Sequence, residues 1–512
     1  MLDRVSNLGG IFGKKELHPL ADAQELKRII ASLPKDNTFR AVDELAGWLE
    51  SAQAADQVPI DRLYEAARQF DEAGQPYLRR LCRDYLHAPR QSRAEEKRLW
   101  SISHGFWLLL ADAYERCLNG MAAGGRPADQ LKAALPLICA RLIAALAAAL
   151  KWEQFHYGPS DSAIWARLGR ALLTAEAAGV DARAVQLGGS ISSPVQEYQK
   201  VMIFKAASTD SLLPLEIELA ERLIEHFLGS FVFTAEVQHD CVYWVDLTLP
   251  QPPLRLAQMP AAAVASQRFF KPGPAHAAIC ELLRGLERGD EIPVDLKLGA
   301  QYYPRTLIPV LRHLAAYLAP IPPQRRHDRH RVKHRMSVLN GLVNAFVAFS
   351  GEFGGKPAGL QMESWVVDNV TRGGFGALVN DIPADWLRVG ALVAIQPEGG
   401  DNWLLGIVRR YHRATESDAR VGIETIARQA CSVELKVRGA SSYAAVSGTP
   451  ALLLENRGAP GEVLVVLPPA SFDLQESMEF TIDGRRCLLT PAALVEQTAD
   501  YELARYHLSR LA

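Results

Sequence analysis

The sequence predicts a multidomain α+β protein. We expect an all-α N-terminal region of repeat-like helical hairpins with one β-hairpin insertion, then an antiparallel β-barrel and a further β-rich module. The chain has 512 residues, which at about 100 to 200 residues per domain indicates several domains. Apolar residues follow helical spacing in the first part and strand spacing in the last. Prolines at 320, 322 and 323 separate the two patterns, because proline cannot continue a helix.

The composition excludes several classes of protein. Hydrophobic residues make up 48% and charged residues 22%, as in globular rather than disordered chains. The 56 Lys and Arg nearly balance 58 Asp and Glu, so no overall field favours nucleic acid or an anionic membrane. The seven cysteines form no CxxC pair, which argues against a disulfide framework or a zinc knuckle. Without a recognisable secretion signal, we expect a cytoplasmic protein.

Residues 1 to 20 form an N-terminal tail in this prediction, and residues 21 to 320 form the helical domain. Phe39, Val42, Leu45 and Leu49 recur at three- and four-residue steps, which is the spacing of one helix face. The segments Ala73-Gly74-Gln75-Pro76 and Asn119-Gly120 are expected to separate neighbouring helices into antiparallel pairs. No fixed period identifies a named repeat.

Two segments of this domain need separate interpretation. Residues 135 to 150 are apolar enough to suggest a membrane helix, but Arg141 lies at their centre, where it costs roughly 2.5 to 3.5 kcal/mol on insertion scales. We therefore expect a buried core helix and no membrane span. Residues 231 to 256 alternate as strands do around Gln238-His239-Asp240, which predicts a β-hairpin.

After the prolines, short Val, Ile, Leu and Thr runs alternate with glycine-containing turns. This pattern is typical of a small antiparallel barrel, which we assign to residues 321 to 428. Residues 429 to 512 form a further β-rich module, in which Asp483-Gly484 is a strong hairpin signal.

The densest basic cluster of the chain lies at the start of the predicted barrel. Residues 324 to 335 hold six cations and the single acid Asp328; the cations are Arg325, Arg326, Arg329, Arg331, Lys333 and Arg335. One interpretation is a solvated linker between domains. The other is an anion-binding loop, in which either Arg325 and Arg329 or Arg331 and Arg335 form an Arg-x-x-x-Arg pair.

A second polar element follows at residues 369 to 374. On an extended strand, Asn369 and Thr371 face the same side, and Gly373 and Gly374 permit a bend beside them. In isolation this pattern is weak, because many hairpins end in glycines.

Together the two elements resemble the PilZ family, small β-barrels that bind cyclic di-GMP through an RxxxR element and a D/N-x-S/T-x-x-G element. The resemblance covers residues 325 to 428 and implies a ligand site at Arg331, Arg335, Asn369, Thr371 and Gly374. The second register is preferred, because Arg335 leads into the first barrel strand, where the family places its second arginine. Further candidates are Arg325, Arg326, Arg329 and Arg372.

The residue types suit this ligand for physical reasons. Cyclic di-GMP carries two phosphodiester charges and two guanines, and Arg binds phosphate with two parallel hydrogen bonds while its plane stacks on a purine. The N1 and N2 hydrogens of guanine need an acceptor, such as the Asn369 carbonyl. Thr371 can add a hydroxyl contact.

No catalytic constellation, metal-ligand spacing or cofactor motif stands out in the chain. We expect a receptor, not an enzyme, in which ligand binding at the barrel reorients a helical domain that binds a protein partner. By resemblance, its outputs would be motility, pilus function, exopolysaccharide or biofilm formation. The alternative is a degenerate PilZ protein that serves as an interaction scaffold. Residues 430 to 512 contain neither ligand element and have no assigned role.

Overall fold

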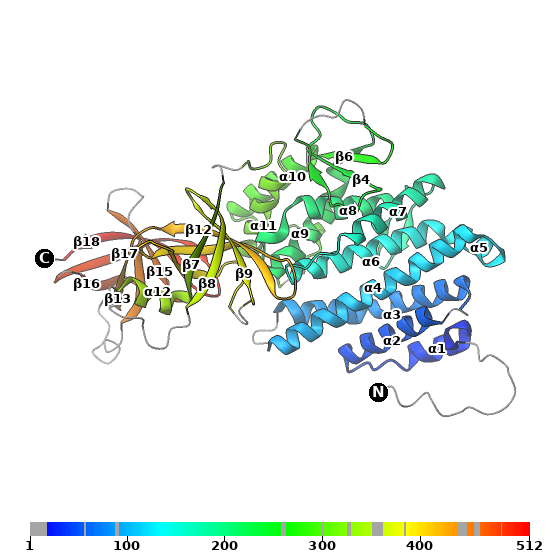
Figure 1. Cartoon of the computed structure of the whole chain (residues 1–512), viewed down its shortest axis with the longest axis horizontal. Coiled ribbons are helices and arrows are strands. Elements are labelled where there is room, and N and C mark those ends of the chain that lie inside the picture. The colour runs from blue at the N-terminus through cyan, green and yellow to red at the C-terminus, as the bar shows by residue number, and fades with distance from the viewer. Residues whose placement is uncertain are drawn as a thin grey trace. The chain divides into compact units, whose positions relative to one another are not determined.

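The computed structural model describes residues 18–55, 58–87, 92–257, 263–299, 301–324, 329–350, 362–382, 386–438, 448–454, 461–482 and 484–511. The chain divides into two compact units. The helical unit comprises Met1–Phe155, Asp161–Ser208 and Pro214–Pro322, and the barrel unit comprises His156–Ser160, Thr209–Leu213 and Pro323–Ala512. The predicted helical N-terminal region and β-rich C-terminal region are confirmed (Figure 1).

The helical unit is built from α1 (Ala23–Ala31), α2 (Thr38–Ala54), α3 (Ile60–His87), α4 (Arg93–Ala123), α5 (Arg126–Leu131), α6 (Leu135–Phe155), α7 (Ala163–Ala177), α8 (Pro194–Ala206), α9 (Pro214–Phe227), α10 (Pro274–Glu287) and α11 (Pro304–Tyr317). Helix α4 packs against α2, α3 and α6. Val42, Leu45 and Leu49 of the predicted α2 face are fully buried. Asn37 caps α2 by accepting a hydrogen bond from the Arg40 amide, which satisfies one free N–H of its first turn.

The helices are longer than the sequence predicts. Helix α3 continues through Pro76, and α4 continues through Asn119-Gly120 to Ala123. A proline inside a helix costs about 3 kcal/mol, but α3 buries apolar side chains on both sides of it, including Phe70 and Leu78. This tertiary packing outweighs the local preference for a break.

Helix α6 contains the apolar stretch of the chain. By length and composition alone, residues 126–155 could cross a membrane, but most of the apolar stretch is buried within the protein. Its central Arg141 donates to Asp71 of α3 at 2.6 Å. The arginine is thus part of a buried ion pair between two core helices.

The predicted hairpin at 231 to 256 is wrong in its pairing. Strands β3 (Val232–Thr234) and β4 (Tyr243–Asp246) belong to one sheet but do not pair with each other, because β6 (Gln267–Lys271) lies between them. Strand β5 (Leu254–Arg255) pairs with the other edge of β4. Phe270 of β6 stacks on Tyr243, so aromatic packing accompanies the nonlocal pairing.

The barrel unit contains two closed antiparallel barrels of six strands each. The first barrel consists of β7 (His330–Asn340), β8 (Glu363–Thr371), β9 (Gly374–Asn380), β10 (Leu392–Pro397), β11 (Leu404–Arg413) and β12 (Asp418–Ala427). The second barrel consists of β13 (Ala430–Val437), β14 (Thr449–Leu454), β15 (Glu462–Leu467), β16 (Met478–Ile482), β17 (Arg485–Gln497) and β18 (Glu502–Arg510). In chain order, both barrels pair their strands as 1-2-3-6-5-4, and the ring closes between the fourth and the first.

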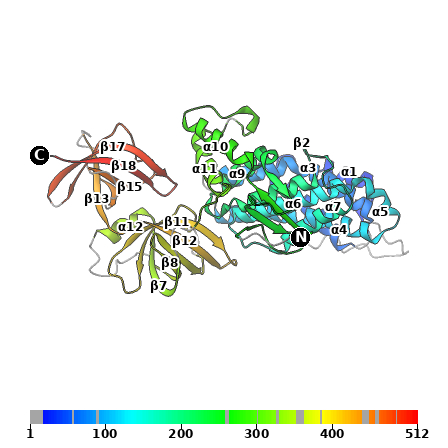
Figure 2. The same cartoon turned by 90° about the horizontal axis from the view of Figure 1, so that it is seen from above.

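A shared hydrophobic cluster joins the two barrels. Helix α12 (Gly341–Phe349) follows β7 and lies between them (Figure 2). Its Leu342 and Ala345 pack in one cluster with Leu392 of the first barrel and Leu452 and Leu454 of the second. The two barrels therefore form one compact body.

Candidate functional site

A pocket of about 320 Å³ opens on the first barrel and contains part of the predicted site. It lies where β8, β9, β11 and β12 run side by side. The described residues that line this barrel pocket are Arg329, Asn369, Thr371, Gly373, Gly374, Phe375, Arg409, Arg410, Gly422, Ile423 and Glu424. Its volume is at the lower end of the range of small-molecule sites.

A bulge in β8 sets the direction of the polar side chains. The pairing of β8 with β9 skips one residue between Val367 and Asn369. Val370 then packs against the barrel core, while Asn369 and Thr371 on either side of it line the pocket. Asn369 donates to the neighbouring Asp368 carboxylate.

The Thr371 hydroxyl has a structural role. It donates to the Gly374 carbonyl at 3.3 Å and accepts from the Gly373 amide at 3.3 Å, which holds the turn between β8 and β9. It remains at the pocket surface, so the same hydroxyl can also face a bound molecule.

Two glycines let the pocket strands approach closely. A Cβ at Gly374 would lie 2.0 Å from the Ile423 carbonyl oxygen, so this glycine is required for β9 to pair with β12. A Cβ at Gly376 would lie 2.2 Å from Asn369 Nδ2. The place of the Asn369 amide thus depends on a glycine that the sequence analysis did not single out.

The basic cluster at residues 324 to 335 contributes Arg329, among its described residues, to the pocket. Arg331 is exposed, and its Cα pairs with that of Asn369 in the β7–β8 ladder. Arg335 lies further along β7, where its guanidinium donates to Ser364 Oγ at 3.1 Å. Arg331 therefore lies beside Asn369 in the ladder, but neither Arg331 nor Arg335 is among the pocket-lining residues.

Arg325 and Arg326 lie outside the described residues. Arg372 is exposed in the turn after β8, is not among the pocket-lining residues, and its carbonyl accepts from Arg428 at 3.4 Å.

Sequence reasoning missed two arginines of β11. The pairing of β11 with β12 shifts between Val408 and Arg410, and Arg409 and Arg410 both line the pocket. Arg409 donates through Nε to Glu424 Oε2 at 2.7 Å and through both terminal nitrogens to Glu496 of the second barrel, at 2.6 and 2.8 Å. The adjacent pair of arginines was visible in the sequence, but the bulge that exposes both was not.

Counter-charges surround the Arg409 guanidinium. Burial alone would lower the pKa of Arg409, but the hydrogen bonds and charges of Glu496 and Glu424 outweigh it and raise this pKa. Burial likewise opposes ionisation of Glu496, yet its contacts with Arg409 lower its pKa below the ordinary value. Both groups are therefore held in their charged forms.

The second arginine, Arg410, lies 4.0 Å from the Asp210 carboxylate. Asp210 belongs to Thr209–Leu213, which connects α8 to α9 in the chain but is part of the barrel unit. A second short segment, His156–Ser160, also belongs to the barrel unit. Its Tyr157 hydroxyl donates to the Leu212 carbonyl at 2.8 Å, and its Tyr157 carbonyl accepts from the Arg413 amide at 2.7 Å.

The pocket chemistry suits an anion attached to a flat ring. Three arginines line it, together with one acidic residue, Glu424, and Asn369. Guanidinium groups bind phosphate or carboxylate, and their planes stack on rings. Among the described residues, no group of three His, Cys, Asp or Glu side chains is placed to hold a metal ion.

Comparison with known proteins matches a different part of the chain. Residues 24–237 match a family described as the N-terminal domain of the cyclic-di-GMP receptor FimW. The match covers most of the helical unit and ends before the first barrel. No curated protein matches the chain.

Proposed function

We propose that the chain is a cytoplasmic cyclic di-GMP receptor that binds the nucleotide in the barrel pocket. The observation that carries the proposal is the meeting of Arg329 with Asn369, Thr371 and Gly374 in one pocket. These residues represent both elements of the PilZ resemblance. The similarity of residues 24–237 to a domain of a cyclic di-GMP receptor supports the same ligand from an independent part of the chain.

The pocket residues divide the recognition of the ligand among them. In this proposal Arg329 and Arg410 bind the phosphodiesters, because guanidinium forms paired hydrogen bonds with phosphate oxygens. Glu424 and the Asn369 carbonyl accept from N1 and N2 of a guanine. Phe375, which also lines the pocket, offers an aromatic face to the base.

We assign the Arg-x-x-x-Arg element to Arg325 and Arg329. Among the described residues of the basic cluster, Arg329 lines the pocket, and Arg325 precedes it by four residues in the sequence. Arg325 lies two residues and Arg329 six residues after Pro323, so a ligand bound by both would reorient the helical domain on the barrel. A protein partner of that domain would then sense the change, with motility, pilus function, exopolysaccharide or biofilm formation as outputs.

Titration calorimetry of the full chain tests nucleotide binding. We expect saturable binding of cyclic di-GMP. Cyclic di-AMP should bind at least about tenfold more weakly, because adenine has no N1 hydrogen to donate to Glu424 or Asn369. A flat trace with both nucleotides at high micromolar concentration would contradict the proposal.

The second candidate function is a scaffold whose barrel has lost nucleotide binding. It is favoured by the state of Arg409, whose charge is already neutralised by Glu424 and Glu496. Small-angle scattering separates the two functions. A receptor changes its interdomain shape when cyclic di-GMP is added, and a scaffold gives the same curve with and without it.

A further inference from the structure

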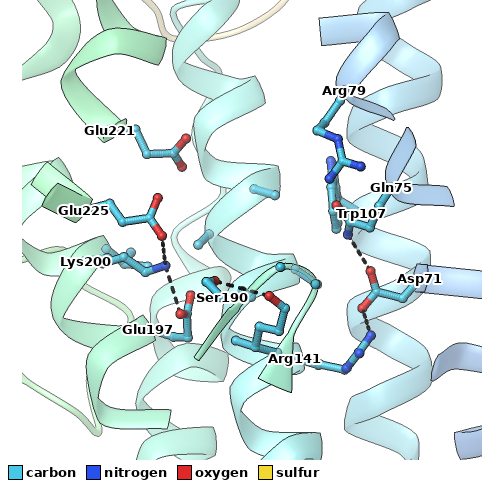
Figure 3. Close-up of a pocket in the computed structure, with 18 of the residues that line it drawn as sticks. Asp71, Gln75, Arg79, Trp107, Arg141, Ser190, Glu197, Lys200, Glu221 and Glu225 are labelled. Carbon is cyan, nitrogen blue, oxygen red and sulfur yellow. Dashed lines mark hydrogen bonds and ion pairs between the residues drawn. The ribbon is translucent and has the colours of Figure 1, made fainter. Parts of the chain in front are cut away.

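The helical unit contains a second pocket, of about 360 Å³, which neither the sequence motifs nor the comparisons assign. Figure 3 shows its two walls, one from α3 and α4 and the other from α8 and α9. Alanines of α6 form the floor, and the hairpin of β1 (Val185–Leu187) and β2 (Ser190–Ser192) lines one end. We call it the helical pocket; its volume suits a small molecule.

Donors line the side of the pocket formed by α3, α4 and Arg141 of α6. Arg141 is almost fully buried and bonds Asp71 at 2.6 Å and Glu72 at 3.1 Å, yet its Nε–H has no hydrogen-bond partner among the described residues. A buried donor without a partner is costly, so an acceptor is favoured there. Arg79, one helical turn beyond Gln75, also lines this wall and is exposed. A ligand carboxylate can accept from Arg79, and the Arg141 Nε–H is a further donor at the other end of the same side (Figure 3).

The opposite wall carries a surplus of carboxylates. Glu197, Glu221 and Glu225 line it beside the single cation Lys200 (Figure 3). Lys200 lies 2.9 Å from Glu197 and 3.7 Å from Glu225, so its charge is shared.

A second lysine, Lys151, is likewise paired with two carboxylates. Lys151 contacts Glu221 at 2.5 Å and Glu218 at 2.9 Å. Burial, with the neighbouring Glu218, raises the pKa of Glu221 despite Lys151, so a further cation beside Glu221 would favour its charged form. A cationic group on a ligand would act in this way.

We propose that the helical pocket binds a small amphoteric molecule, with its carboxylate at Arg79 and its ammonium or guanidinium group at Glu221 and Glu225. Trp107, on the same wall as Arg79, adds an aromatic face against which an aliphatic stem or a cation can pack. A free basic amino acid and the C-terminal basic residue of a protein both have this chemistry. Five lining carboxylates disfavour a dianionic nucleotide, so the ligand differs from that of the barrel pocket.

Calorimetry of the full chain with L-arginine tests the proposal. We expect saturable binding of L-arginine at millimolar concentration or below. Agmatine, which lacks the carboxylate, and L-citrulline, which lacks the positive charge of the side chain, should each bind at least about tenfold more weakly. The tripeptide Gly-Gly-Arg identifies the source. Tighter binding than L-arginine, lost on C-terminal amidation, indicates a protein chain end, and weaker binding indicates the free amino acid.

Two exposed positions supply variants that leave the core intact. Arg79→Ala and Glu225→Gln should each weaken binding of the better probe by about tenfold, because each removes one charge-assisted contact. Arg80→Ala is the matched control, since Arg80 is also exposed on α3 but does not line the pocket. The proposal is overturned if neither L-arginine nor the tripeptide binds, if agmatine binds as well as L-arginine, or if all three variants behave alike.

Discussion

The two barrels share one strand order and differ in the residues placed on it. In the first barrel the second strand, β8, ends with Asn369 and Thr371 at a pocket. In the second barrel the corresponding strand, β14, ends with Leu452, Leu453 and Leu454, all of which are buried. The same scaffold therefore carries a polar pocket in one copy and a docking surface in the other.

The bulges mark a further difference between the barrels. In the first barrel, the strand pairing of β7, β8 and β11 shifts register near the barrel pocket or near the basic cluster. In the second barrel the described irregularities lie in the pairing of β17 with β18, the strand pair that includes Glu496. A bulge changes which residues face outward, so a barrel can gain or lose a site without a change of topology.

The largest expected effect, on stability, comes from exchanging the residue types at the ends of β14 and β8. Leu454→Thr should destabilise the protein by about 2 to 4 kcal/mol, because a leucine in the cluster that joins the barrels is replaced by a smaller, polar residue. The reverse change, Thr371→Leu, should cost less stability, about 1 to 2 kcal/mol for the two lost turn hydrogen bonds, and weaken binding of cyclic di-GMP. Urea denaturation and calorimetry measure the two effects. Equal destabilisation by both variants would mean that the polar end of β8 is as important for stability as the end of β14.

The next largest effect tests which arginines belong to the pocket. Arg329→Ala should weaken binding of cyclic di-GMP by about 30- to 150-fold, the equivalent of about 2 to 3 kcal/mol for lost charge-assisted bonds. Arg335→Ala is the matched control and should change the affinity by less than about threefold, because its guanidinium bonds Ser364 away from the pocket. Calorimetric titration of both variants distinguishes the registers. A larger loss of affinity for Arg335→Ala than for Arg329→Ala would favour the register preferred from the sequence, Arg331 and Arg335.

Local patterns were sufficient to predict that Asn369 and Thr371 share a surface. Alternation along a strand puts residues i and i+2 on one face, and both line the barrel pocket. The register of the arginines could not be chosen in this way, because the irregularity between Arg331 and His334 interrupts the alternation of β7. Spacing alone cannot report a bulge that depends on the partner strand.

Nonlocal contacts account for the rest. Arg409 was not singled out in the sequence, and its place in the pocket depends on pairing with β12 and on Glu496, 87 residues away. In the helical unit, α3 likewise continues through Pro76, because burial of its apolar side chains outweighs the tendency of proline to end a helix. Sequence periodicity thus predicted which elements exist, while tertiary packing decided where they end and which side chains meet.

The smallest expected effect concerns the ion pair that links the barrels. In Glu496→Gln, Arg409 loses one of its two counter-charges but is still held by Glu424 at 2.7 Å. Its charge becomes available to a ligand phosphate, so cyclic di-GMP should bind about two- to fivefold more tightly, in line with the ~0.4 to 1 kcal/mol of a partly exposed ion pair. Glu462→Gln is the control, because Glu462 pairs with Arg505 within the second barrel.

The pH dependence gives this prediction its sign. Because the pKa of Glu496 is lowered in the folded protein, the pair contributes fully above the unfolded value of about 4.3 and is lost as the pH falls through the folded value. The advantage of Glu496→Gln should therefore be present at pH 7 and shrink only as the pH falls through the lowered pKa of Glu496, where the wild-type carboxyl is protonated as well. Titrations over a series of pH values from 7 downwards measure it. Weaker binding by Glu496→Gln at pH 7 would instead mean that the second barrel positions Arg409 for the ligand, and the difference between the barrels would then be a division of labour within one site.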